Sequence, residues 1–347
     1  MPFATLFSNV AAKLFGAAPG AGAIEPELVQ MAVEAVVDAV DPRLRSVAGY
    51  ARKIAPGMAS TITHMRALAT DMPAPIVLSR AAWAGDPLVN AMFATTGDVP
   101  TVLGRSEELR AFFSAPANAA RGEAHALLGA VKTERSVFAP AIVDGQLRQD
   151  VAQTTMNFSA HRVIAPGADF AACRREVGVR ILRRLAALAL ARITAAGARA
   201  TGLEQRKAML GAQLRMLHLR RDGLQDIAGG ARNDAVQIAS IERELQATVD
   251  DYVEARASLA TLASRIDHVN AVFTAPADCV SYTPVGVRVN RMGYKVAADS
   301  DEPASELTLG ELAIGDGLRA VIVFVRCPRA ELPARESLGA RAARQGL

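Results

Sequence analysis

The sequence predicts an α+β protein in which a long antiparallel coiled-coil helical hairpin is inserted between the strands of a mixed or antiparallel β body. Two observations support this prediction: heptad repeats of apolar residues in the middle of the chain, and strand-like segments with tight-turn signals on both sides of them. A chain of 347 residues is long enough for two or three structural units. We expect five segments: an N-terminal segment (1–24), a helical region (25–132), a β body formed by two stretches (133–167 and 276–327), the helical hairpin between them (168–275) and a tail (328–347).

Residues 1–24 are predicted to form a short amphipathic helix followed by a tether rich in Gly, Ala and Pro. Such a helix can dock on a membrane surface, on a partner or on the protein's own body. The apolar face that would dock consists of Phe3, Leu6, Phe7, Val10 and Leu14. We do not expect a signal peptide, because the stretch lacks a basic start and polar residues interrupt its apolar part.

Residues 25–132 are predicted to be a helical region. Pro26 suits the first turn of a helix, and Asp41-Pro42 would end that helix. Ser106 followed by two glutamates is a typical helix start. After the first helix, the helices expected in this region cover 43–54, 57–71, 86–94, 106–114 and 118–132.

Two stretches, 133–167 and 276–327, are predicted to form the β body. In the first, Asp144-Gly145 favours a tight hairpin turn, because these residue types tolerate the positive φ angles that such a turn needs. A separate strand is expected just before Pro166. In the second stretch, Gly315-Asp316-Gly317 predicts another hairpin.

After the helical hairpin, two strand segments are expected at 280–282 and 285–289, because apolar and polar residues alternate there. The last segment, 328–347, is rich in Arg, Ala and Gly and is expected to be a frayed tail.

Residues 168–275 are predicted to be the helical hairpin, because apolar residues recur there in alternating steps of three and four. In its second helix, the predicted seam consists of Ile238, Ile241, Leu245, Thr248, Tyr252, Ala255, Leu259, Leu262, Ile266, Val269 and Phe273. In its first helix, the seam consists of Leu203, Leu210, Leu217 and Leu224. Gly229-Gly230 lies between the two runs, where the chain would reverse its direction.

The expected register places Leu224 opposite Ile238 and Leu203 opposite Leu259. It also predicts three contacts across the hairpin: Arg220 with Glu242, His218 with Glu244, and Lys207 with Glu254. We expect a break in the first helix between Gly197 and Gly202, and an unbroken second helix over 234–273. A parallel homodimer through 238–273 is the alternative to the hairpin, and a homodimer through the tip of the arm stays open.

Basic residues concentrate between residues 171 and 221, although the net charge of +4 is mild. Phosphates of nucleic acid or of anionic lipid could contact five arginines that have no evident acidic partner: Arg174, Arg175, Arg180, Arg183 and Arg184. The alternative is that these arginines pair with acids of the N-terminal helical region, such as Glu25, Glu27 and Glu34.

No set of residues predicts an active site. The histidines are scattered, and the sequence contains no metal-ligand spacing, nucleophile elbow or phosphate loop. We therefore expect no metal and no cofactor. Cys173, Cys279 and Cys327 are expected to be free, buried thiols. No run reaches the roughly 18 apolar residues of a membrane-spanning helix.

The leading hypothesis is a non-catalytic cytoplasmic interaction or scaffold protein that engages a protein partner through its arm or its N-terminal helix. The excess of arginine over lysine and the abundance of alanine indicate a bacterial, G+C-rich coding background. One alternative is a peripheral binder of nucleic acid or of the anionic inner-membrane surface, acting through the arginines of 174–184. The other alternative is an enzyme whose site is assembled from dispersed residues.

Overall fold

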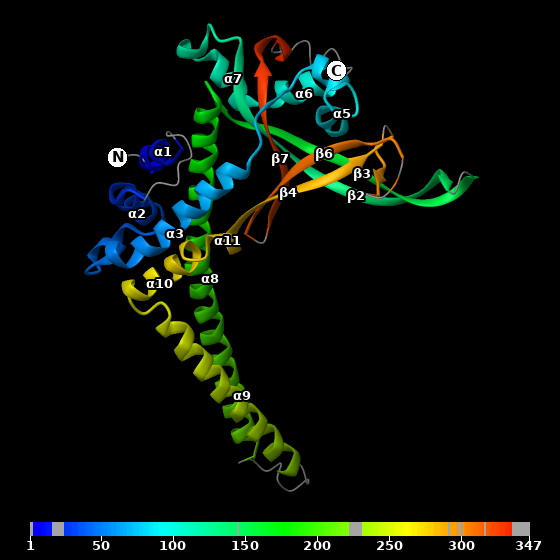
Figure 1. Ribbon diagram of the computed structural model, residues 1–347. Helices are drawn as coiled ribbons and strands as arrows, with labels where there is room; N and C mark the ends of the chain where they lie inside the picture. The colour runs from blue at the N-terminus through cyan, green and yellow to red at the C-terminus, as the bar shows by residue number, and fades with distance from the viewer. Residues whose placement is uncertain are drawn as a thin grey trace, which may run out of the picture. The chain divides into compact units, whose positions relative to one another are not determined.

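The computed structural model describes residues 3–15, 24–143, 146–221, 231–290, 292–297, 300, 302–315 and 317–334. It has the α+β fold that the sequence predicts, with a long helix between two strands of an antiparallel sheet (Figure 1). The chain divides into two units. The sheet unit contains residues 1–31, 61–182 and 276–347, and the hairpin unit contains residues 32–60 and 183–275.

The helices are named as in Figure 1. The α-helices are α1 (Phe3–Phe15), α2 (Pro26–Val40), α3 (Tyr50–Asp71), α4 (Arg80–Gly85), α5 (Pro87–Met92), α6 (Asp98–Arg105), α7 (Glu107–Ser114), α8 (Phe170–Arg221), α9 (Ala231–Ala257), α10 (Leu262–Phe273) and α11 (Pro276–Cys279). The 3₁₀ helices are η1 (Pro42–Ser46), η2 (Pro116–Asn118) and η4 (Arg329–Glu331).

The strands form one sheet in the order β3-β2-β7-β6-β4-β5, and β1 pairs with β7 as well. They are β1 (Ile76–Val77), β2 (Glu123–Val143), β3 (Gln146–Gly167), β4 (Val280–Val289), β5 (Lys295–Val296), β6 (Ser305–Ile314) and β7 (Leu318–Pro328). Among the described strands, β1 pairs with β7 in parallel, and the other pairs are antiparallel. The loop after β4 also reaches β3, since the backbone N–H of Met156 donates to the carbonyl of Gly293 over 3.1 Å.

Both predicted β-hairpins are confirmed. Val143 lies opposite Gln146, and Ile314 lies opposite Leu318. Residues 144 and 145 themselves lie outside the described residues, whereas Gly315 has the positive φ angle, 57°, of a tight turn. The two flanking strands, β3 and β4, belong to one sheet but do not pair, because β2, β7 and β6 lie between them.

The strand β2 corrects the expected helix over 118–132. This stretch is rich in Ala and Leu, which favour helices, but it lies between two strands that pair with it. Its even-numbered residues from Ala124 to Ala130 are all buried. That period of two is a strand signal, and pairing on both edges outweighs the local helix propensity.

The strands β3 and β4 are also longer than predicted. Each is one continuous strand, where the sequence predicted a separate strand before Pro166 and a division after residue 282.

Helices cover both faces of the sheet. One face packs against α5, α6 and α7 through a buried cluster that includes Phe93, Leu103, Leu109 and Val325. The opposite face receives the start of α8, where the ring of Phe170 contacts the ring of Phe324 edge to face at 5.0 Å between centroids. The predicted helix over 106–114 is confirmed as α7, and the Ser106 side chain accepts a hydrogen bond from Leu109 N–H.

The helices of the hairpin unit differ from the expectation in three ways. First, α3 is continuous through Pro56, while residues 42–46 form the separate 3₁₀ helix η1. Proline costs a helical hydrogen bond, and the complete burial of Ile54 and Met58 offsets that cost. Second, α8 has no break between Gly197 and Gly202.

The third difference is a break where an unbroken helix over 234–273 was expected. The helix α9 ends at Ala257, and α10 begins at Leu262. Thr261 caps α10, because its side chain accepts a hydrogen bond from Ser264 N–H and the Ser264 side chain accepts one from Thr261 N–H. The His268 ring lies 3.2 Å from the Ser258 carbonyl that the break leaves free.

The end of α10 belongs to the core of the hairpin unit. Val269 and Phe273 are fully buried, as is Leu44 of η1. An ion pair joins the same two elements, with Arg265 Nη1 at 2.9 Å from Asp41 Oδ2.

Candidate functional site

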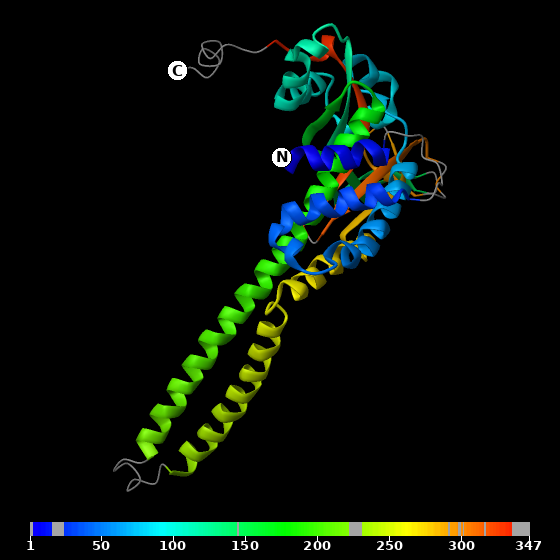
Figure 2. The same ribbon diagram turned by 90° about the vertical axis from the view of Figure 1, so that its left-hand side faces the viewer.

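The helices α8 and α9 lie side by side and run antiparallel (Figures 1 and 2). Three contacts show the pairing. Arg206 Nη2 lies 2.6 Å from Glu244 Oε1, the Lys207 ammonium lies 4.4 Å from the Tyr252 ring centroid, and Gly197 faces the Leu259 side chain.

The seam residues that the sequence predicts are buried or half-buried wherever their side chains are described. In α8, Leu210 and Leu217 are buried and Leu203 is half-buried. In α9 and α10, every predicted seam position from Ile238 to Phe273 is buried or half-buried. Leu224 and Gly229-Gly230 lie outside the described residues.

The predicted register is wrong. Glu244 pairs with Arg206 and not with His218, and Lys207 contacts Tyr252 and not Glu254. Gly197, rather than Leu203, faces Leu259. The three contacts are displaced from the predicted register in the same direction by 3 to 12 residues, which is about one heptad on average, and a shift of one heptad returns the same apolar residues to the seam.

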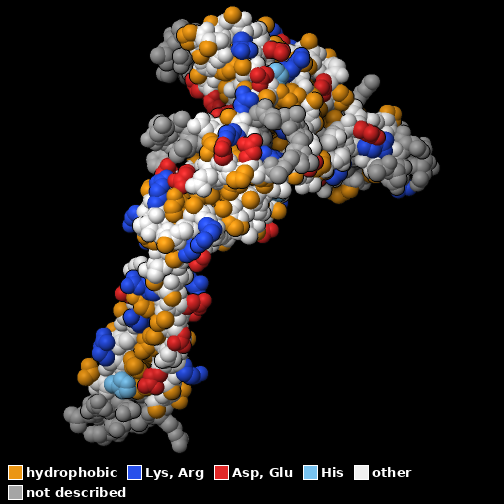
Figure 3. All heavy atoms as spheres, turned by 60° about the vertical axis from the view of Figure 1, so that its left-hand side comes forward, with side chains coloured by type: hydrophobic (Ala, Val, Ile, Leu, Met, Phe, Trp, Pro, Cys, Tyr) orange, Lys and Arg blue, Asp and Glu red, His pale blue; other side chains and the backbone are white. Residues whose placement is uncertain are grey.

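Exposed apolar side chains concentrate on this helix pair. Six of the ten large apolar side chains exposed in the described part of the chain belong to α8 or α9. They are Leu190, Met209, Met216, Leu219, Val236 and Val253. Apolar side chains also reach the surface of this unit in the space-filling view (Figure 3). Large apolar groups in contact with water are typical of interaction surfaces when they are clustered.

The five arginines of 174–184 do not form one free basic surface. Arg180 donates to both carboxylate oxygens of Glu108, over 3.1 and 2.7 Å, and to Glu176 over 3.2 Å. Arg174 donates to the carbonyl of Ala69 over 3.0 Å. Burial lowers the pKa of the Arg174 guanidinium below its usual value.

Of the other three arginines, Arg175 is half-buried, whereas Arg183 and Arg184 are exposed. The acidic partners of Arg180 are therefore Glu108 of α7 and Glu176 of α8 itself, and not Glu25, Glu27 or Glu34. Lys13 pairs with Glu27 and Arg45 with Glu34.

The Glu108 carboxylate also accepts a hydrogen bond from Ala165 N–H over 2.9 Å. Burial alone would raise the pKa of Glu108, but the hydrogen bonds from Arg180 and from Ala165 N–H lower it below its usual value. A carboxyl with a lowered pKa in the folded state stabilises the protein above its unfolded pKa of 4.5. That contribution is lost as the pH falls through the lower, folded pKa.

Glu108→Gln should therefore lower the free energy of unfolding at pH 7 by about 1 kcal/mol, because the pair is partly exposed to solvent. The loss should shrink as the pH falls below 4.5 and the wild-type carboxyl becomes protonated. Urea unfolding at several pH values measures both effects. Glu107→Gln, on the same helix, serves as the control and should change little. An equal loss for the two variants would contradict the role of the Glu108 pair.

The apolar face of α1 is buried at the two positions where its side chains are described. Phe7 has 2% of its surface exposed and Val10 has none. The side chains of Phe3, Leu6 and Leu14 lie outside the described residues. The burial favours docking of this helix on the protein itself over docking on a membrane or a partner.

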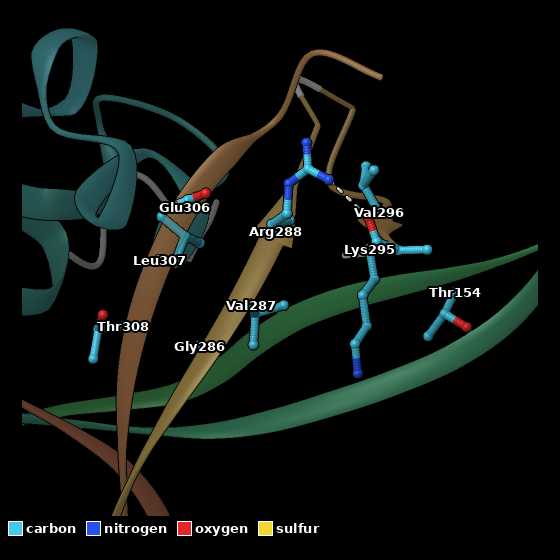
Figure 4. Close-up of a pocket in the computed structure, with 10 residues that line it drawn as sticks. Thr154, Gly286, Val287, Arg288, Lys295, Val296, Glu306, Leu307 and Thr308 are labelled. Atoms are coloured by element: carbon cyan, nitrogen blue, oxygen red, sulfur yellow. Dashed lines mark hydrogen bonds between the residues drawn. The ribbon is translucent and has the colours of Figure 1, made fainter. Parts of the chain in front are cut away.

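A groove of about 500 Å³ opens between β4, β5 and β6 (Figure 4). Its two cations are engaged in contacts with the protein. Arg288 Nη1 donates to the carbonyls of Ala297 and Ser300, each over 2.8 Å, and Lys295 Nζ lies 3.5 Å from Glu134 Oε2. The residues that line the groove include no pair of nucleophile and base within hydrogen-bond distance, so they do not form a recognisable catalytic set.

The histidines are also used structurally. The His64 ring bonds the carbonyl of Val280 over 2.7 Å, and the His161 ring stacks on Phe93 with centroids 4.7 Å apart. Burial lowers the pKa of His161. Among the described residues, no group of three His, Cys, Asp or Glu side chains could hold a metal ion. No described helix has the length and apolarity needed to cross a membrane.

The three cysteines are free and buried. Burial raises the pKa of the Cys173 and Cys327 thiols to about 12 in each case. The thiolate is the reactive form, so we expect the native protein to resist a disulfide reagent such as DTNB at pH 8. All three thiols should react once urea unfolds the chain. Rapid reaction of one thiol in the native protein would contradict the observed burial.

Among the described residues, the sheet unit thus contains no group that could hold a metal ion, and the lining of the groove contains no paired nucleophile and base. The exposed apolar and basic surface of α8 is the most distinctive candidate for a functional surface. Comparisons with protein-family models, with curated proteins and with solved structures found no match to this chain.

Proposed function

We propose that the protein is a non-catalytic interaction protein that engages a protein partner through the helix pair α8–α9. The observation that carries this proposal is the concentration of exposed apolar side chains on these two helices. A solvated helix pair needs one apolar seam to hold it together, and that seam is already present on its inner side. Large apolar groups outside the seam, such as Met216 and Leu219, contribute nothing to the pair and are available to a partner.

The proposal places the protein in the bacterial cytoplasm, as a scaffold whose arm is its binding element. Binding of nucleic acid or of a membrane surface through the arginines of 174–184 has less support, because Arg174 and Arg180 are engaged within the protein. A catalytic function has no residue set to carry it in the described part of the chain.

A photo-crosslinking amino acid placed at Met216 tests this proposal in cells that express the full chain. We expect a discrete covalent adduct with one protein at near-stoichiometric yield. The control position is Phe138 of β2, which is 78% exposed but lies outside the helix pair. The adduct should be absent there and should disappear when Met209→Asp is added to the Met216 derivative. Equal adduct patterns at both positions, or none at Met216, would refute the proposed function.

A further inference from the structure

A second apolar stripe runs along the outer side of α8. It begins at Ala191 and continues in alternating steps of four and three residues to Leu219. Eight of its nine positions are apolar residues or glycine, and Gln205 is the exception. All nine positions are exposed, including Met209 at 56%, Met216 at 65% and Leu219 at 74%. We call this set of positions the outer stripe.

The outer stripe points away from α9. Successive residues of an α-helix are rotated by about 100°, so the centre of the outer stripe lies about 120° around α8 from the centre of the inner seam. The exposures agree with this geometry: Leu210 and Leu217 of the seam are 3% and 8% exposed, while their stripe neighbours Met209 and Met216 are exposed. Such a 3-4 spacing is the pattern by which one helix packs along another.

A row of positive charge accompanies the outer stripe. Arg192, Arg199 and Arg206 follow one another at heptad spacing, and Arg220 continues the row after Gln213. Arg206 pairs with Glu244 of α9. The other three are exposed and form no ion pair with any residue that the structure describes. From residue 177 to residue 221, Glu204 is the one acidic residue of α8.

We infer that the outer stripe binds an amphipathic helix of a partner protein whose apolar face is flanked by acidic residues. This inference rests on the proposed function and names the chemistry of the partner. Glutamates at the edge of that helix would pair with the arginine row, and its apolar residues would cover Met209, Met216 and Leu219. Residues as small as Ala198 and Gly202 allow the two helix backbones to approach closely in the first half of the stripe.

Two other occupants fit less well. A second copy of α8 would bring two rows of arginine together, and like charges at such positions are destabilising. On the outer face of the acidic helix α9, Arg243, Gln246 and Asp250 separate the exposed side chains of Val236 and Val253, so a second copy would offer no continuous apolar stripe through this helix. A membrane surface favours bulky aromatic and leucine side chains, whereas half of the outer stripe consists of small residues.

Two synthetic helical peptides of four heptads test the inference on the full-length protein. Both carry the same leucine and alanine stripe; one has glutamate and the other has lysine at the flanking positions. Fluorescence anisotropy of the labelled peptides should show at least about tenfold tighter binding of the glutamate peptide at low salt. The difference should shrink as the ionic strength rises, because exposed charges are screened.

Variants of the protein identify the surface. Arg199→Glu and Met216→Asp should each weaken binding of the glutamate peptide by about tenfold or more. Arg243→Glu, a matched charge reversal on the outer face of α9, should leave it unchanged. Circular dichroism checks that each variant keeps its helix content. Equal binding of both peptides, or of neither, would overturn the inference.

The competing occupants have their own readouts. Light scattering that shows a dimer broken by Met216→Asp would assign the stripe to a second copy. Binding to vesicles of equal parts phosphatidylcholine and phosphatidylglycerol, without binding of the glutamate peptide, would assign it to an anionic membrane. If the Met216 crosslink forms in cells but the glutamate peptide does not bind, the inference fails and the proposed function stands. If no crosslink forms at Met216, the proposed function fails, and the inference fails with it.

Discussion

Leu210→Asp should unfold the α8–α9 pair while the sheet unit stays folded. The Leu210 side chain is 3% exposed in the inner seam, so aspartate at this position loses the apolar burial of leucine and places a carboxylate in the seam. The lost burial alone is worth about 2–5 kcal/mol by analogy with leucine-to-alanine changes in protein cores. The buried charge adds to that cost, which makes about 3–5 kcal/mol a conservative expectation.

The neighbouring position supplies the control. Met209 is 56% exposed on the outer stripe, so Met209→Asp should change the free energy of unfolding by less than about 1 kcal/mol. Aspartate substitutions at these two adjacent positions of α8 thus distinguish the stability effect of the inner seam from that of the outer stripe. Only the first should destabilise the hairpin, while both should reduce partner binding.

Two measurements distinguish local from global unfolding. The helical signal in circular dichroism reports on α8 and α9, which contribute many of the helical residues. The thiols of Cys173, Cys279 and Cys327 all belong to the sheet unit, so their protection from DTNB reports on that unit alone. Leu210→Asp should lose helical signal and keep its thiols protected. A wild-type spectrum for Leu210→Asp would show that the seam does not hold the pair together.

The parts of the fold that sequence reasoning predicted correctly depend on short-range signals. Residues 144–145 and 315–317 carry turn-forming residue types between strand-like runs, and both hairpins are present. Ser106 caps α7 in the way that its sequence context indicates. In each case, the information lies within a few residues of the feature.

The wrong predictions concern features that depend on residues distant in the sequence. The stretch from Glu123 has the composition of a helix and becomes a strand, because β3 and β7 pair with its two edges. The hairpin register is displaced because a heptad repeat matches itself after a shift of seven residues. The break between α9 and α10 has a local signal, the Thr261–Ser264 capping box, but the heptad pattern continues across it.

The candidate surface shows a similar limit. The inner seam and the outer stripe of α8 have the same alternating spacing, so sequence periodicity alone does not say which of them faces α9. The interpretation built on Leu203, Leu210 and Leu217 left Met209 and Met216 without a role. Likewise, nothing near Arg180 in the sequence indicates Glu108, which lies on a different element and becomes its partner only in the folded sheet unit.

A large effect of a single added methyl group is expected at Gly167, where β3 leads into α8. A Cβ atom at this position would lie 2.5 Å from the backbone nitrogen of Cys173 and 2.9 Å from the carbonyl carbon of Ala172. Both are backbone atoms in the first turn of α8, which hydrogen bonds from Ala172 N–H and Cys173 N–H to Asp169 hold in place. They cannot rotate away as a flexible side chain would.

Gly167→Ala should therefore lower the free energy of unfolding by about 3 kcal/mol, at the upper end of the usual cost of overpacking. Gly129→Ala in β2 is the matched control, because a Cβ at Gly129 has no neighbour within 4 Å. Alanine loses less backbone entropy than glycine on folding, so this variant should be neutral or stabilised by up to about 1 kcal/mol. Urea unfolding followed by the fluorescence of Trp83, the one tryptophan of the chain, measures both in the sheet unit. Coincident unfolding curves for the two variants would mean that β3 and α8 do not meet as closely as described, since only close contact makes the methyl group costly.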